Sequence, residues 1–174
     1  MRCRLLLAGL LATCAIGVHG QSPAEAKLTR QLQTLFPTAT SFSQKIPNPP
    51  HFKAYGKDAA GAPTLIGVAF WTTELEPLER AYDGPIKILV GLDTHGALSG
   101  VLVVEHHEPY GYFSVEPPGF AAQFKGKSIR DPFVVGRDID AVSRATISMG
   151  SATRAIRNSS RRIARQLLNP TDVP

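Results

Sequence analysis

Apolar residues recur at helical spacing in two segments, one near each end of the chain. From Ala24 to Phe36 they fall at positions 28, 32, 35 and 36, which is one face of a short helix that Pro37 would end. From Ser151 to Leu168 a longer helix is predicted, which Asn169-Pro170 would end. The apolar residues on one side of that helix are Ala152, Ala155, Ile156, Ile163, Ala164 and Leu167.

The middle of the chain predicts strands of a single sheet. Three runs are rich in β-branched and aromatic residues and are bounded by turn-forming residues: Thr64 to Thr73, Ile86 to Leu92 and Leu98 to Glu105. The turn Asp93-Thr94-His95-Gly96 separates the last two, and its glycine supplies the positive φ of a tight connection. We therefore expect an antiparallel pair.

The segment between Pro37 and Pro63 is rich in Pro, Ser, Lys and Gly. The run Pro47-Asn48-Pro49-Pro50 cannot hold regular structure for long, whereas residues 56–61 have the composition of a hairpin tip between short strands. A short helical turn is expected from Phe120 to Phe124. The predicted fold is α+β, a small antiparallel sheet packed by the short N-terminal helix and the longer C-terminal helix.

The first residues are typical of an export signal. A basic start at residues 1–4 precedes an apolar run from Leu5 to Val18, and Val18-His19-Gly20 offers small residues for a signal peptidase. We expect residues 1–20 to be removed. The alternatives are a membrane anchor, for which the run is short of the roughly 20 residues that span a bilayer, and a lipid anchor on Cys14.

Composition limits the chemistry of the exported chain. The full sequence of 174 residues, of which 43% are hydrophobic and 19% charged, suits one globular domain. Both cysteines, Cys3 and Cys14, lie in the signal, so thiol nucleophiles, disulfides and iron–sulfur clusters are excluded from the mature protein. Loss of Arg2 and Arg4 leaves 17 basic against 14 acidic residues, a balance that does not indicate nucleic acid as a partner.

The stretch Asp140 to Thr146 (D-A-V-S-R-A-T) precedes the predicted C-terminal helix. Thr146 would lie near the free N–H groups and the dipole of a helix start, which favour a phosphate, with Ser148 and Ser151 available as N-caps. The alternative is ordinary helix-capping chemistry without a ligand.

The run His106-His107-Glu108-Pro109-Tyr110-Gly111 follows the third predicted strand. Adjacent histidines with a glutamate suggest a metal site, but neighbours on a strand point to opposite faces, so one histidine at most would easily serve a given ion. An ordinary exposed strand end and a ligand-binding loop are the other interpretations.

Three segments in order resemble the FMN-binding domain family: Y-D-G-P-I-K-I-L-V-G-L-D from Tyr82, G-V-L-V-V-E-H-H-E-P from Gly100 and G-R-D-I-D-A-V-S-R-A-T from Gly136. The H-H-E-P run is most similar to the periplasmic domain of nitrous-oxide reductase regulators. Components of the sodium-translocating quinone reductase and of the related ferredoxin-linked complex are more distant relatives. The likeness covers roughly residues 60–168.

The resemblance implies FMN as the cofactor, linked through its phosphate to the last threonine of a D-x-x-S/T-G-A-T pattern by a magnesium-dependent flavin transferase. Thr146 is then the acceptor, and Asp140, Ser143 and Ala145 match its neighbours. Arg144 replaces the family's glycine. An arginine does not easily adopt positive φ, but it can pair with the flavin phosphate and hold FMN without a covalent bond.

Other flavin contacts follow from the same resemblance. Glu108 and Gly111 occupy the place of a loop near the isoalloxazine, and Tyr82 and Gly84 belong to the Y-D-G-P segment. The aromatic residues that can stack on a flavin are Tyr82, Tyr110, Tyr112, Phe113 and Trp71, of which we expect one or two at most to do so.

The functional prediction is an exported, periplasmic electron carrier with its FMN-binding domain at 64–168, after an N-terminal helix and Pro-rich connection at 21–63 and before a tail at 169–174. Its partners would be periplasmic or membrane redox proteins, with no membrane span of its own. A flavin-reductase component with a separate catalytic subunit and a flavin-free structural or assembly protein are the alternatives. Arg154, Arg157, Arg161 and Arg165 form a helix stripe that is either solvated or a docking face for an acidic partner.

Overall fold

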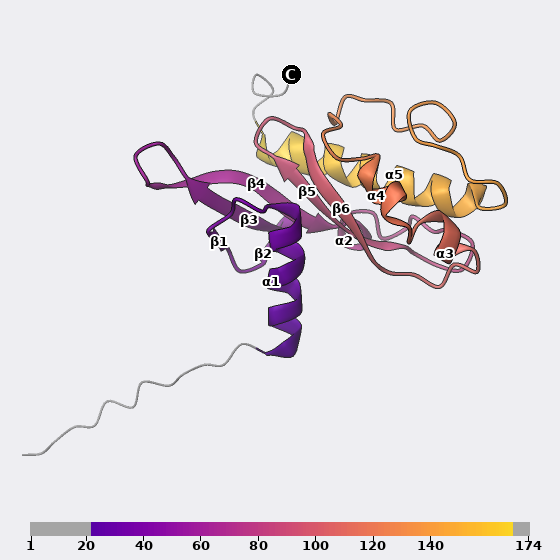
Figure 1. The fold of residues 1–174 in the computed structure, drawn as a ribbon, viewed down its shortest axis with the longest axis horizontal. Coiled ribbons are helices and arrows are strands. Elements are labelled where there is room, and N and C mark those ends of the chain that lie inside the picture. The colour runs from indigo at the N-terminus through magenta and orange to yellow at the C-terminus, as the bar shows by residue number, and fades with distance from the viewer. Residues whose placement is uncertain (1–21, 169–174) are drawn as a thin grey trace, which may run out of the picture.

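A computed structural model describes residues 22–168, which form an antiparallel sheet flanked by helices (Figure 1). The strand order is β1-β3-β4-β5-β6, and β2 pairs with β3. The strands are β1 (Ser41–Phe42), β2 (Ile46–Pro47), β3 (Pro50–Lys57), β4 (Pro63–Trp71), β5 (Lys87–Asp93) and β6 (Leu98–Glu105). The predicted α+β class is confirmed.

Helices α1 (Pro23–Leu35) and α5 (Thr146–Leu167) cover opposite faces of the sheet. Leu89 of β5 packs in one apolar cluster with Leu32 and Leu35 of α1, whereas its neighbours Ile88 and Val90 pack in the other with residues of α5. Because successive side chains of a strand point to opposite faces, β5 is buried on both sides. This explains why the segment from Ile86 to Leu92 is apolar at every position except Lys87.

Both predicted hairpins are present. Lys57 pairs with Pro63 across the tip between β3 and β4, and Gly96 has φ 81° in the turn between β5 and β6. The carboxylate of Asp93 accepts hydrogen bonds from the backbone of His95 and Ala97, which fixes this turn. Strand β3 begins at Pro50. Proline is tolerated there, since the first residue of a strand need not donate a ladder hydrogen bond.

Three short helices connect the larger elements: α2 (Thr72–Leu75), α3 (Gly111–Ser114) and α4 (Pro118–Ala122). The predicted strand 64–73 extends too far, because the chain turns into α2 at Thr72. The buried Thr72 hydroxyl donates to the carbonyl of Ile86 and accepts from the N–H of Ile88. Thr72 therefore still contacts the start of β5, although it lies beyond the end of β4.

Several predictions concern residues outside the described range. The signal peptide at 1–20 with both cysteines, and the tail at 169–174 with the Asn169-Pro170 helix stop, lie there. Within residues 22–168, no helix has the length and apolar character needed to cross a bilayer.

Candidate functional site

Helix α5 begins at Thr146, earlier than the predicted start at Ser151. Ala145 is the N-cap and provides no side-chain hydrogen bond, so the prediction that Ser148 or Ser151 caps the helix is wrong. Both serines are buried inside the helix. The first backbone N–H groups of a helix have no partner within it, and here they belong to Thr146, Ile147 and Ser148.

A tight turn delivers the chain to this helix start. The N–H of Ala145 donates to the carbonyl of Val142 at 3.2 Å, and Arg144, the third residue of the turn, has φ 68°. The third position of a type II turn requires positive φ, which glycine adopts most easily. The turn therefore accounts for the glycine of the family pattern, and Arg144 adopts a conformation that costs an L-residue about 1–2 kcal/mol.

A cavity of about 300 Å³ opens beside the turn and the helix start. This volume is at the lower end of the range for small-molecule sites. The residues that line it come from three segments and are Tyr82, Pro109, Tyr110, Arg144, Ala145, Thr146, Ile147 and Ser148. Tyr82, Tyr110 and Ile147 are exposed.

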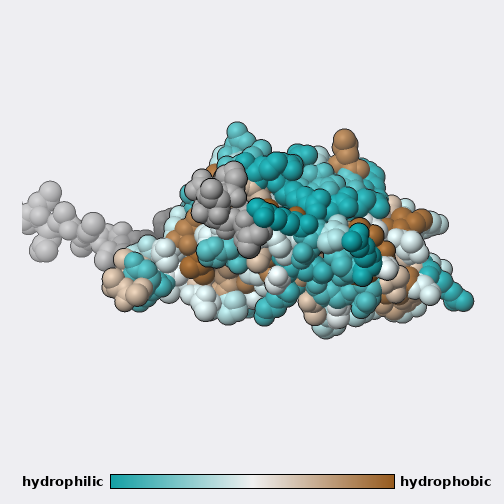
Figure 2. Space-filling view, turned by 90° about the horizontal axis from the view of Figure 1, so that it is seen from above, coloured by the Kyte–Doolittle hydropathy of each residue, from teal (hydrophilic) through white to brown (hydrophobic). Residues whose placement is uncertain are grey.

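The surface around this end of the molecule includes hydrophobic residues (Figure 2). Most of the face seen from above is hydrophilic, and one group of hydrophobic residues lies toward the right-hand end, where α3 and the start of α5 are found in Figure 1. An apolar cavity rim beside a helix start offers contact to a planar ring and hydrogen bonds to an anion at once.

Glu108 joins the three segments that line the cavity. Its side chain is 6% exposed, and its carboxylate accepts hydrogen bonds from the backbone N–H groups of Tyr82 and Asp83, at 3.3 and 2.8 Å, and from the hydroxyl of Ser148. Glu108 does not line the cavity. The buried carboxylate thus connects its own loop to α5 and to the turn at residues 81–84, called the Tyr82 turn below.

Gly111, the first residue of α3, follows the same loop and packs on His106. A Cβ at position 111 would overlap the imidazole, which leaves no room for a larger residue. His106 accepts from the N–H of Glu108 at Nδ1, 3.1 Å, so its Nε2 faces Glu116 at 3.0 Å as the donor. Among residues 22–168 no cluster of three or more His, Cys, Asp or Glu side chains could hold a metal ion.

The Tyr82 turn is held from outside as well. Gly84, at φ 107°, pairs with Ala81 in an isolated bridge that closes the turn. Arg154 of α5 donates two hydrogen bonds to Glu79, and Arg162 pairs with Glu76 at 3.1 Å. The segment from α2 to β5 is therefore fixed to the helix by two ion pairs.

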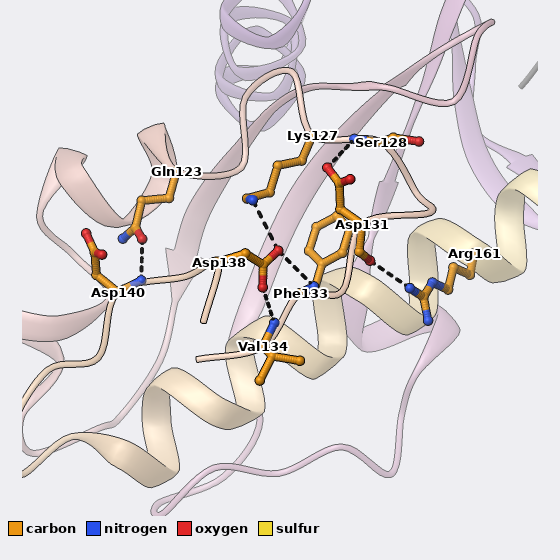
Figure 3. A network of polar contacts seen from close by, with 9 residues as sticks. All are labelled: Gln123, Lys127, Ser128, Asp131, Phe133, Val134, Asp138, Asp140 and Arg161. Atoms are coloured by element: carbon orange, nitrogen blue, oxygen red, sulfur yellow. Dashed lines mark hydrogen bonds and ion pairs between the residues drawn. The ribbon is translucent and has the colours of Figure 1, made fainter. Parts of the chain in front are cut away.

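The loop between α4 and α5 is organised by Asp138 (Figure 3). Its carboxylate accepts hydrogen bonds from the N–H groups of Phe133 and Val134, at 3.0 and 2.6 Å, and from the ammonium of Lys127 at 3.1 Å. Burial raises the pKa of Asp138, but these hydrogen bonds lower it more, and the pKa lies below its ordinary value. Phe133 itself has φ 51°.

Gln123 and Arg161 also hold this loop in place (Figure 3). Gln123 accepts from the N–H of Asp140 at 2.6 Å, and Arg161 of α5 donates to the carbonyls of Ile129 and Asp131, both at 2.8 Å. Burial, with the charges of Arg157 and Arg165, lowers the pKa of Arg161 from its ordinary value. Because Arg154 and Arg161 have these structural partners, the predicted arginine stripe is not a uniformly solvated face.

The structure gathers part of the predicted site around the cavity. Of the predicted cofactor ligands, Tyr82, Arg144, Ala145 and Thr146 line it. Five lie elsewhere: Glu108 and Gly111 behind the wall, Gly84 in the Tyr82 turn, Ser143 in the tight turn, and Asp140 exposed beside Gln123. Their contribution to binding stays a prediction.

Other predicted or overlooked residues are placed by the same geometry. Tyr110 lines the cavity, whereas Phe113 packs between Tyr110 and Tyr112, and Trp71 stacks under the ammonium of Lys87 at 5.0 Å. Sequence reasoning missed Ile147, whose only signal is an apolar residue that α5 leaves exposed.

Comparison with known proteins agrees with this geometry. Residues 81–160 match the family described as FMN-binding domain, a range that includes every residue lining the cavity. The chain is also similar to the Regulatory protein NosR of Pseudomonas aeruginosa, with 29% identity over 157 residues, covering 84% of this chain and 21% of that protein. The chain spans about a fifth of the length of that relative.

Proposed function

We propose that the chain, whose residues 81–160 match the FMN-binding domain family, is an electron carrier which holds FMN in the cavity at the start of α5. The observation that carries this proposal is the convergence of aromatic rings, an arginine and a helix start on one cavity. Bound FMN supplies one- and two-electron transfer, and the protein binds and orients it. Export and redox partners in the periplasm or the membrane belong to the same proposal.

The phosphate end of FMN fits the wall formed by residues 144–148. The N–H groups of Thr146, Ile147 and Ser148 and the positive end of the α5 dipole favour a phosphate there. Arg144 adds a full positive charge to the same wall. The carboxylate of Glu108, which would oppose an anion, is turned to its own three donors.

The ring end fits the wall formed by Tyr82 and Tyr110. Both phenol rings line the cavity, with 72% and 47% of their surface exposed, so they offer faces or edges that a planar ring can cover. None of the residues that line the cavity is a carboxylate, histidine or cysteine. In the proposed carrier the flavin performs the redox chemistry, and the cavity binds and orients it.

Thr146 is the proposed attachment point for FMN. Its side chain is exposed at the first position of α5 and lines the cavity, whereas the nearby hydroxyls of Ser148 and Thr153 belong to buried residues. Esterification would join the threonine oxygen to the FMN phosphorus of a flavin dinucleotide and break its pyrophosphate bond. The nucleoside monophosphate would leave, and the hydroxyl proton would pass to solvent. A dedicated flavin transferase would supply that donor.

Intact-mass measurement tests the attachment. The full chain is co-expressed with a flavin transferase, and its mass is compared with those of two variants. Thr146→Ala removes the hydroxyl, and Thr146→Ser keeps it. We expect one esterified FMN on the wild type, none on Thr146→Ala, and some on Thr146→Ser. A modified Thr146→Ala chain would contradict attachment at Thr146, and the same spectra report whether residues 1–20 are removed.

The carrier role is tested on the flavin-loaded protein. We expect the bound FMN to be reduced and reoxidised by small redox mediators without steady turnover of a soluble electron acceptor. Steady turnover by the isolated protein would instead identify a flavin reductase. A colourless protein that binds no added FMN would contradict the proposal and identify a flavin-free member of the fold.

A further inference from the structure

We propose that Arg144 is a specificity-determining ligand, which binds the phosphate of FMN and makes this cavity select FMN over riboflavin before any ester forms at Thr146. The proposal rests on the proposed FMN site and adds to it a source of affinity that does not depend on covalent attachment. It concerns the residue at which the chain departs from the family pattern.

The tight turn does not explain an arginine at this position. Arg144 has φ 68°, a conformation in which glycine is free and an L-residue is strained. Strain of this kind persists mainly where it serves a functional site. Because Arg144 lines the cavity, the function that we assign to it is ligand binding.

Two arginines of α5 are engaged in ion pairs with the segment before β5. Arg154 donates to Glu79, and Arg162 pairs with Glu76. Arg144 differs from them, since no hydrogen bond or ion pair joins its guanidinium to another of residues 22–168. Its charge is thus available to a ligand in the cavity.

The donors next to Arg144 specify the kind of ligand. The residues with free N–H groups at the start of α5 lie within the next four positions and line the same cavity as Arg144. A guanidinium presents a planar fork of donors that matches phosphate oxygens in pairs. Riboflavin carries the same ring as FMN without a phosphate, so it leaves these donors unused.

The experiment uses the full chain produced without a flavin transferase, so that binding is non-covalent. FMN and riboflavin are titrated by quenching of flavin fluorescence against wild type, Arg144→Gly and Arg144→Lys. Arg137→Ala is the matched control, because Arg137 is an exposed arginine of the same loop that does not line the cavity. Thermal unfolding of the flavin-free proteins is recorded in parallel.

We expect Arg144→Gly to weaken FMN binding roughly 10- to 100-fold, the loss that one charge-assisted contact represents, and to leave riboflavin binding almost unchanged. Arg144→Lys should keep part of the preference, since it retains the charge but not the fork. The flavin-free Arg144→Gly protein should melt about 2–4 °C higher, because glycine relieves the positive φ. A gain in stability with a loss of FMN affinity cannot arise from misfolding.

Three outcomes would overturn the inference: equal affinity of the wild type for FMN and riboflavin, unchanged FMN binding by Arg144→Gly, or an equal loss for Arg137→Ala. A wild-type protein that binds neither flavin would instead contradict the proposed function itself. Raising the salt concentration supplies a further readout, because screening should weaken FMN binding by the wild type more than by Arg144→Gly.

Discussion

The hydroxyl of Ser148 donates a hydrogen bond to the carboxylate of Glu108, 40 positions earlier in the chain. This contact joins the first turn of α5 to the loop after β6, and the same carboxylate holds the Tyr82 turn. The cavity therefore depends on a residue that does not line it. A change at Glu108 should move the walls relative to one another.

We predict that Glu108→Gln lowers the free energy of unfolding by about 1–3 kcal/mol. Both oxygens of the Glu108 carboxylate accept hydrogen bonds, and the amide nitrogen of glutamine would replace one of these acceptors with a donor. FMN affinity should fall as well. Chemical denaturation and FMN titration measure both effects. Glu105→Gln is the control, since Glu105 is an exposed glutamate at the end of β6 and should change neither quantity.

Ser148→Ala should cost less than Glu108→Gln, about 1 kcal/mol, because Oε2 of Glu108 keeps the N–H of Tyr82 as a donor. The double variant should cost less than the sum of the two single changes, since the Ser148–Glu108 bond can be lost only once. Additive costs would mean that the contact contributes nothing to stability.

Gly111→Ala tests the packing behind the cavity wall. The new methyl group would overlap the ring of His106, which cannot yield easily because Glu108 and Glu116 hold its two nitrogens. We expect a loss of about 1–3 kcal/mol in unfolding free energy, the usual cost of overpacking. Gly119→Ala in α4 is the control: it meets nothing within 4 Å and should be neutral or stabilising. Equal effects at the two glycines would contradict the steric argument.

The regular elements were predictable because their signals are local. Strand β6 has the predicted bounds, 98–105, and α1 lies within one residue of its prediction at each end. Ser22, Glu25 and Pro37 mark the two ends of α1 in the sequence itself, through a capping box and a helix breaker. Such chemistry does not depend on the rest of the fold.

The start of α5 was not predictable in the same way. Nothing in the side chain of Ala145 caps the helix, and Ser148 resembles an N-cap although its hydroxyl is used by a glutamate distant in sequence. The cavity has the same difficulty, since residues near 82, 110 and 146 are distant in sequence and meet only in the tertiary structure. The resemblance predicted four of its lining residues. It could not distinguish these from residues that support the cavity without lining it, such as Glu108, which connects three segments, and Gly111, which packs on His106.

The loop between α4 and α5 should lose stability in acid through Asp138. Its pKa in the folded protein lies below the ordinary value of 3.8, so its stabilising contribution is fully present above that value and disappears as the pH falls through the lower, folded pKa. Asp138→Asn removes the contribution at every pH. Wild type and variant should therefore differ by about 1–3 kcal/mol near pH 7 and begin to converge as the pH falls below about 4, with full convergence below the folded pKa.

Urea denaturation at several pH values measures that difference. Asp140→Asn is the control, because Asp140 exposes its carboxylate and contributes only its backbone N–H to the network. A gap between wild type and Asp138→Asn that stayed constant from pH 7 to pH 3 would show that the charge of Asp138 is not the source of its effect.

The two ends of the flavin should be separable by mutation. Tyr82 lines the cavity, whereas the similarly exposed Tyr112 packs edge-to-face on Phe113, ring centroids 4.8 Å apart, and does not line it. Tyr82→Ala should weaken the binding of FMN and of riboflavin by the same factor, roughly 5-fold for one aromatic contact, because both share the ring that it touches. Tyr112→Ala should leave both affinities unchanged. Fluorescence titration of the two flavins distinguishes this pattern from that expected at Arg144, where FMN alone is affected. A loss confined to FMN in Tyr82→Ala would place Tyr82 at the phosphate end and contradict the orientation proposed for the cofactor.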